Sequence, residues 1–174
     1  MNTKMKKLTA VLAALVMVFA MTAALSEGSA VAFRNGVKFG MSVNEVRAAE
    51  SGQGELDHEH EGLGFDELEY EHVTVDELPA ELKYLFLGDR LVAIRVQYDR
   101  AGYDQVKAKL TAQFGDAAAV DLQLLGKGVF AVDDDGRLEV KAEAIVSGHL
   151  IIVLEQDEED VNVTYVDLTA GYLQ

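Results

Sequence analysis

The sequence contains no cysteine and only one proline among its 174 residues. Without cysteine there is no disulfide framework, no lipid-modified N-terminal cysteine, and no thiolate to serve as a nucleophile or a metal ligand. Stability must therefore come from a hydrophobic core. A chain of this size buries about two thirds of its extended-chain surface in one core, so we expect a single domain.

Basic residues are scarce, since 15 Lys and Arg stand against 30 Asp and Glu, and the formal net charge is −15. Such a surface repels phosphate backbones and anionic lipid headgroups, so we expect no nucleic-acid partner and no membrane contact beyond the N-terminal segment. The shortage is sharpest between Arg47 and Lys83, where many acidic residues and no Lys or Arg occur. This stretch is either a solvated acidic surface, compensated by basic residues further along the chain, or a face for a cation or a basic partner.

The first 24 residues have the layout of a secretory signal peptide. Lys4, Lys6 and Lys7 precede an apolar run over 11–21, and small residues follow. The pattern predicts cleavage between residues 24 and 30 and export of the mature chain, which would be secreted, periplasmic or part of the cell envelope. Because the run is long for a signal and short for a membrane span, an uncleaved signal anchor is the alternative.

Two helices are predicted. Ser42 and Glu45 have the spacing of a capping box, in which a hydroxyl and a carboxylate satisfy free amides at a helix start, so a short helix should begin at Val43. Within 102–115, apolar residues recur at helical spacing and Gly115 provides a C-terminal stop. The apolar stripe of this second helix consists of Tyr103, Val106, Leu110 and Phe114.

Strands are predicted by alternation of apolar and polar residues. Residues 81–99 alternate on both sides of Gly88 and Asp89, which indicates a β-hairpin, and 69–75 is a further strand separated from it by Pro79. Three more strands are expected within 138–166. An Asp-Gly turn precedes them, and a Ser-Gly turn and an acidic loop separate them.

Short turns join consecutive strands, so the sheet should be antiparallel and the fold class α+β, with helices on one face. The order of a helix followed by strands occurs twice. It suggests that the single domain, residues 31–174, consists of two similar halves that divide near residue 100.

The stretch ELDHEHEGLG, residues 55–64, contains the clearest potential metal ligands. In an extended segment, residues two apart point to the same side, so His58 and His60 would present both imidazoles to one zinc or copper ion, completed by His72 or a carboxylate. The flanking glycines favour a solvated charged loop instead, because they give the ligands no fixed order. A third interpretation is a response to pH, since histidines among carboxylates gain protons readily.

Other chemistry lacks the required spacing. The acidic runs 133–136 and 156–160 do not match the alternating oxygen ligands of an EF-hand, and no glycine pair extends to a nucleotide-binding motif. Ser147 and His149 belong to a predicted turn, and no nucleophile-elbow motif occurs. We therefore expect no catalytic residues, and no cofactor other than zinc or copper at the histidines.

The segment GVKFGMSVNEV, residues 36–46, resembles a motif of small exported bacterial domains. It is similar to the entry helix of BamE-like and β-lactamase-inhibitor-like proteins and of uncharacterised secreted proteins of Gram-positive bacteria. The resemblance implies an α+β fold with a helical layer on an antiparallel sheet and a role in binding other proteins. This chain lacks the anchoring and disulfide cysteines of those families, and the matched residues are explained by capping and packing.

These features predict an exported, acidic, non-catalytic module that binds another extracytoplasmic protein. The alternative class is an extracytoplasmic zinc or copper protein that uses His58, His60 and His72.

Overall fold

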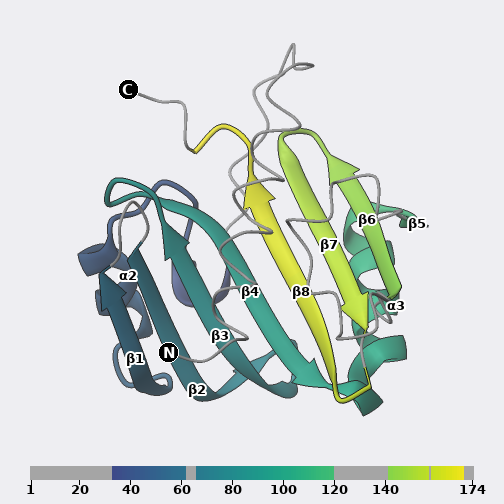
Figure 1. Ribbon diagram of the computed structural model, residues 1–174, viewed down its shortest axis with the longest axis horizontal. Helices are drawn as coiled ribbons and strands as arrows, with labels where there is room; N and C mark the ends of the chain where they lie inside the picture. Colours follow the sequence, from purple (N-terminus) through teal and green to yellow (C-terminus); the bar gives the residue numbers. More distant parts are fainter. Residues whose placement is uncertain (1–32, 62–65, 120–140, 157, 171–174) are drawn as a thin grey trace, which may run out of the picture.

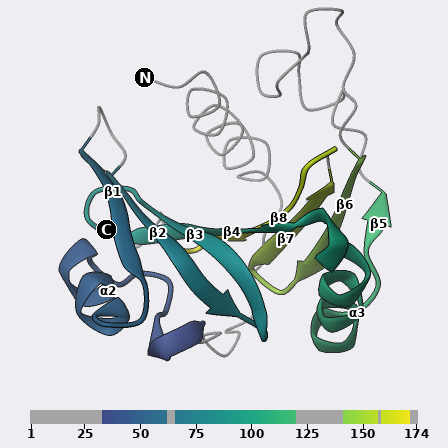
Figure 2. The ribbon, with the colours of Figure 1, turned by 90° about the horizontal axis from the view of Figure 1, so that it is seen from below.

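A computed structural model describes residues 33–61, 66–119, 141–156 and 158–170. The predicted signal peptide and the acidic run 133–136 lie outside these residues. The described chain forms one antiparallel sheet of eight strands, and Figures 1 and 2 show two helices on the same side of that sheet. The predicted α+β class, with helices on one face, is confirmed.

Two helices and two short 3₁₀ turns accompany the strands. The helical elements are η1 (Arg34–Gly36), α2 (Val43–Glu50), η2 (Arg100–Gly102) and α3 (Tyr103–Phe114). The strands are β1 (Glu55–Glu61), β2 (Asp66–Val75), β3 (Leu78–Phe86), β4 (Leu91–Asp99), β5 (Ala118–Ala119), β6 (Lys141–Ser147), β7 (Leu150–Gln156) and β8 (Asp160–Asp167). No described helix is long and apolar enough to span a membrane.

The strand order across the sheet is β1-β2-β3-β4-β8-β7-β6-β5. Each half of the chain starts with a helix and lays down its strands from the outside inward, as Figure 1 shows. The last strand of each half, β4 and β8, then pair along the centre, from Ala93 with Val166 to Asp99 with Asp160. The sheet is therefore continuous through the point near residue 100 where the order of elements starts again.

Helix α2 begins as its sequence predicts. The Ser42 hydroxyl accepts a hydrogen bond from the Glu45 amide, and the Glu45 carboxylate accepts one from the Ser42 amide at 2.8 Å. The hydrogen bonds that the Ser42 amide and the Ser42 hydroxyl donate to the carboxylate hold the pKa of Glu45 below its usual value. The Val43 amide donates to Asp89 Oδ1 at 2.9 Å, so the β3–β4 turn also caps this helix.

The core lies between the sheet and the two helices. Val46 of α2 and Val106 and Leu110 of α3 are buried, while Tyr103 and Phe114 pack partly buried against the core. This confirms the apolar stripe of the second helix, and Gly115 ends it with a φ of 96°. The largest fully buried side chains of the sheet are Leu68, Leu82, Tyr84, Phe86, Leu91, Ile94 and Ile152.

The predicted hairpin turns at Gly88 and Asp89, which both have positive φ, and Leu87 and Arg90 exchange backbone hydrogen bonds across it. Such two-residue turns match the twist of antiparallel strands. A bulge follows, because Phe86 pairs with Leu91 and Leu85 with Ala93.

The expected break at Pro79 is wrong. Pro79 lies inside β3 opposite Thr74, and the turn before β3 is made by Asp76 and Glu77, both at positive φ. The pairing of β3 with β4 starts only at Ala80, so the amide hydrogen that proline lacks removes no bond from that ladder.

Candidate functional site: the acidic edge of the sheet

Residues 55–61 form β1, the terminal strand of the sheet, and not the solvated loop that we expected. They pair with β2 from Glu55 opposite Glu71 to Glu61 opposite Asp66. Charged residues have low strand propensity, but pairing to an existing strand overrides it. The electrostatic cost of the crowded carboxylates is therefore offset by a ladder of backbone hydrogen bonds.

Gly54 sets the start of β1. A Cβ atom at this position would lie 2.5 Å from Val73 Cγ1 and 3.3 Å from the Glu71 carbonyl oxygen. Glu71 and His72 lie in a bulge of β2, where the register with β3 shifts between Tyr70 and Val73. The chain therefore enters β1 in a close contact that glycine alone permits.

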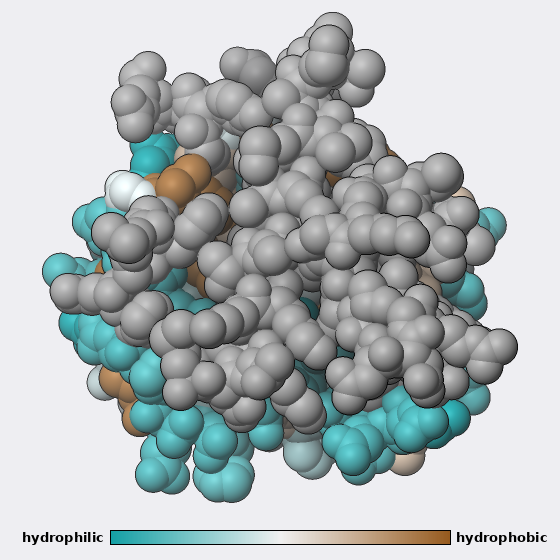
Figure 3. Space-filling view, in the orientation of Figure 1, coloured by the Kyte–Doolittle hydropathy of each residue, from teal (hydrophilic) through white to brown (hydrophobic). Residues whose placement is uncertain are grey.

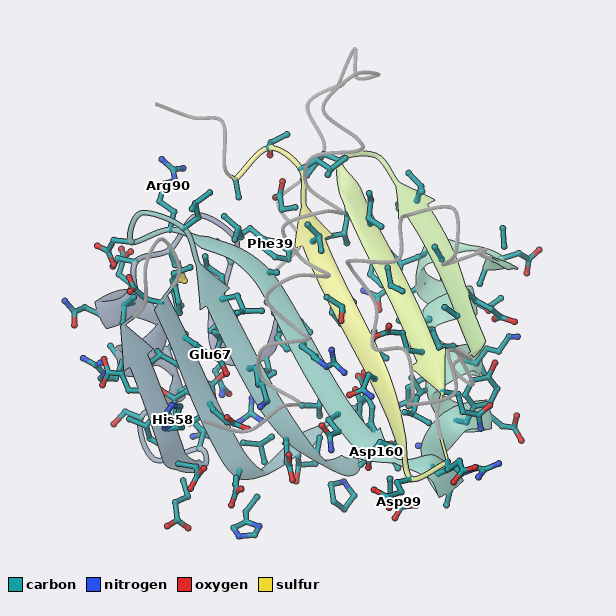
Figure 4. The ribbon with its side chains drawn as sticks, viewed as in Figure 1. Phe39, His58, Glu67, Arg90, Asp99 and Asp160 are labelled. Carbon is teal, nitrogen blue, oxygen red and sulfur yellow. The ribbon has the colours of Figure 1, made fainter. Side chains whose placement is uncertain are left out.

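The register assigns the β1 residues to the two faces of the sheet. Leu56 lies opposite Tyr70 of the core, and Glu59 forms an ion pair with Arg47 of α2, so both are on the helix side. His58 lies opposite Glu69 on the other face, which carries no helix of the described residues and which we call the helix-free side. A bulge at Asp57 separates Leu56 from His58. In Figure 4, His58 lies near the outer margin of the sheet, and Glu67 lies further in.

We call residues 55–59 the acidic edge. Glu55 and Asp57 are exposed, Leu56 is 41% exposed, and the Glu59 side chain is 39% exposed. Figure 3 shows mainly hydrophilic residues on this side of the molecule, where α2 and β1 lie. No described strand pairs with the outer side of β1, because β1 ends the strand order.

Lysine and arginine side chains neutralise only some of the carboxylates of β1 and β2. Lys83 of β3 lies 2.5 Å from Glu69 and 4.0 Å from Glu67, and Arg47 pairs with Glu59. Within the described ranges, no Lys or Arg forms an ion pair with Glu55 or Asp57.

Further along the helix-free side, polar side chains pair across strands from both halves. Arg95 of β4 lies 3.8 Å from Glu155 and donates to Asn162 Oδ1 at 3.1 Å, and Gln97 donates to Asp160 at 2.9 Å. Arg95, one of the basic residues in the middle of the chain, therefore compensates an acid of the second half.

The pKa of Glu81 shows the effect of the neighbouring carboxylates. Burial raises its pKa, and the nearby Glu71 and Glu69 raise it further, against the opposing effect of Lys83. A raised pKa means that the ionised form is destabilised where it stands. An additional cation next to these strands would relieve that destabilisation.

The predicted metal ligands are not all together. His72 lies exposed in the β2 bulge with a φ of 54°, three residues along from Glu69, the register partner of His58. Three strand residues span roughly 10 Å, so His72 is too far along β2 to share an ion with His58 by strand pairing. Among the side chains that the structure describes, no three His, Asp or Glu gather as a metal site. The side chain of His60 lies outside that description, so the zinc or copper site stays a prediction.

One buried polar cluster was not predicted. The Glu50 carboxylate is completely buried, accepts hydrogen bonds from Tyr84 Oη and from Asn35 Nδ2 at 3.0 Å, and lies 3.1 Å from Arg34 Nη2. Burial and this hydrogen bond raise the pKa of Tyr84. The cluster connects η1, α2 and β3. No local sequence pattern predicts it, because its members lie far apart in the chain.

Comparisons with family models, curated proteins and solved structures found no match. The resemblance of residues 36–46 to BamE-like and β-lactamase-inhibitor-like proteins therefore stays a prediction. Fold and site together define an α+β protein with a carboxylate-rich sheet edge, and carboxylates without a nearby cation are groups suited to binding one.

Proposed function

We propose that this protein is an exported, non-catalytic module that binds another extracytoplasmic protein, and that the acidic edge is its contact surface. The observation that carries the proposal is the terminal strand β1, which combines exposed carboxylates with an exposed leucine.

Two physical features support a protein as the partner. Protein interfaces combine apolar contacts with charged groups that select the partner and steer its approach. Leu56 offers the first and Glu55 and Asp57 the second. A net charge of −15 disfavours nucleic acids and anionic lipids as competitors, because every phosphate is repelled.

Site-specific photo-crosslinking in the producing cells tests the proposal. We expect a photoreactive residue at Asp57 to yield a discrete adduct with another extracytoplasmic protein. The same residue at Gln113, exposed on α3 in the other half, is the control and should yield none. Absence of an adduct at Asp57, or the same adduct at both positions, contradicts the contact surface. Hydrolytic or transferase activity of the purified mature chain would contradict the non-catalytic assignment.

An extracytoplasmic zinc or copper protein is the second candidate. It is favoured by the β1 register, which puts His58 and His60 opposite Glu69 and Glu67, two residues apart on one strand. Native mass spectrometry after addition of zinc or copper decides it. Stoichiometric binding that is lost in the His58→Ala/His60→Ala variant supports the site, and the absence of an adduct removes it.

A further inference from the structure

We propose that the outer side of β1 binds an extended, lysine- or arginine-rich segment of the partner as an additional strand of the sheet. This inference rests on the proposed function and specifies the binding mode and the chemistry of the partner.

The first step concerns the backbone. A strand pairs on two sides, and β1 pairs with β2 on one side only, with no described strand on the other. Seven residues of β1 span roughly 23 Å at the usual rise of a strand, enough for a segment of similar length. Such edges are a recurring way of binding extended peptides, in which backbone hydrogen bonds provide affinity.

The second step concerns the charge, which selects the occupant. Charged residues on an edge strand prevent pairing with a second copy of the same chain. A second copy laid against β1 would bring Glu55, Asp57 and Glu59 next to carboxylates of their own kind. A strand that carries Lys or Arg gains from the exposed carboxylates of Glu55 and Asp57, so the edge repels itself and accepts a basic segment.

The third step concerns the two faces. An added strand would put alternate side chains on the two sides of the sheet. On the helix-free side they would lie next to Glu55 and His58 of β1. On the helix side they would lie next to Leu56, which is 41% exposed and offers an apolar contact. A segment that alternates a basic and an apolar residue therefore matches both faces.

A short capped peptide in which lysine and valine alternate is the probe. We expect it to bind the mature protein, with a clear loss of affinity as salt is added. Two isomers separate backbone pairing from charge alone, because one carries N-methyl groups on its lysine amides and the other on its valine amides. Only one set of amides faces β1 in a strand, so one isomer should bind at least about tenfold more weakly and the other like the parent. Equal binding by all three peptides would overturn strand addition.

Two charge variants test the location of the site. Glu55→Gln/Asp57→Asn should weaken peptide binding by roughly tenfold, as expected for the loss of two exposed ion pairs. Glu158→Gln/Glu159→Gln removes the same charge in the exposed β7–β8 connection and should leave binding unchanged. Equal effects of the two variants would show that only the net charge matters.

Two further results would overturn the inference. One is concentration-dependent dimerisation of the mature protein at neutral pH that is abolished by Glu55→Lys, because β1 would then pair with a second copy. The other is no peptide binding while the adduct at Asp57 is present, because the contact surface would stand and strand addition would fail. Loss of both the adduct and the binding removes the proposed function itself.

Discussion

At the scale of single residues, two neighbouring tyrosines differ in their hydrogen bonds. Tyr70 and Tyr84 lie with ring centroids 6.1 Å apart, and both are almost fully buried. The Tyr84 hydroxyl donates to Glu50, whereas the Tyr70 hydroxyl has no partner among the described residues. A buried hydroxyl without a hydrogen bond destabilises the fold by its cost of desolvation. Removal of a hydroxyl that does form a hydrogen bond instead leaves its buried partner unsatisfied.

We therefore predict different results for two phenylalanine substitutions. Tyr84→Phe should lower the free energy of unfolding by about 1–3 kcal/mol, because the buried Glu50 loses a donor. Tyr70→Phe should change it by less than about 0.5 kcal/mol, or raise it. Urea unfolding of both variants measures this directly, and each variant is the control for the other. Equal destabilisation would mean that the hydroxyl of Tyr70 is bonded as well.

The predictable residues of the site are those with a local signal. Ser42 and Glu45 are three residues apart, so their bond follows from helix geometry alone. Tyr84 and Glu50 lie 34 residues apart, and their contact exists only because the sheet places β3 under α2. No pattern of a single sequence indicates such a pair. The same holds for the distance between His58 and His72, which depends on the register of β1 with β2.

At the scale of elements, the β3–β4 turn and helix α2 stabilise each other through Asp89. This residue has a φ of 59° in the turn, and its side chain accepts the hydrogen bond of the Val43 amide. Asn and Asp tolerate the left-handed region better than other side chains, and a side-chain oxygen at a helix start is worth about 1 kcal/mol. One side chain thus serves two elements.

The substitutions at Asp89 should follow a definite order of stability. Asp89→Asn keeps both the backbone conformation and an acceptor, and we expect a change below about 0.5 kcal/mol. Asp89→Gly keeps the conformation but removes the cap, and Asp89→Ala also strains the backbone, so we expect the alanine variant to lose about 2 kcal/mol. Chemical unfolding measures the series. An alanine variant as stable as the asparagine variant would show that neither the cap nor the turn depends on this side chain.

Prediction of the elements succeeded where the local pattern was strong. Both helices and the hairpin follow from capping, apolar spacing and a Gly-Asp turn. Strand β1 was missed because its charged residues carry no apolar alternation, and its partner strand decides its conformation. The prediction of a strand break at Pro79 was wrong because it also depended on pairing. Whether a proline interrupts a ladder of hydrogen bonds depends on which neighbouring strand its nitrogen faces.

At the scale of the whole molecule, buried tyrosines connect stability to alkaline pH, and burial raises the pKa of Tyr70 among them. Tyr84 and Tyr98 belong to the first half and Tyr165 to the second, and burial raises the pKa of each of them well above its usual value. The neutral form is therefore favoured in the folded protein, while the unfolded chain loses phenolic protons near pH 10. Above that pH the folded state binds more protons than the unfolded state, so stability must fall as the pH rises.

We predict an unfolding free energy that tyrosine ionisation leaves unchanged below about pH 10. Above that pH it should decline by about 1.4 kcal/mol per pH unit for each tyrosine whose pKa stays above the pH in the folded protein. Because β4 and β8 pair through the centre of the sheet, both halves should unfold in one transition. Urea unfolding between about pH 8 and pH 11, with phenolate absorbance followed in parallel, measures both. Tyr98→Phe should reduce the slope by about 1.4 kcal/mol per pH unit, since one of these groups is removed. If phenolate absorbance of these residues appears before unfolding, or if the slope is the same in Tyr98→Phe, burial of the three rings does not link this sheet to pH.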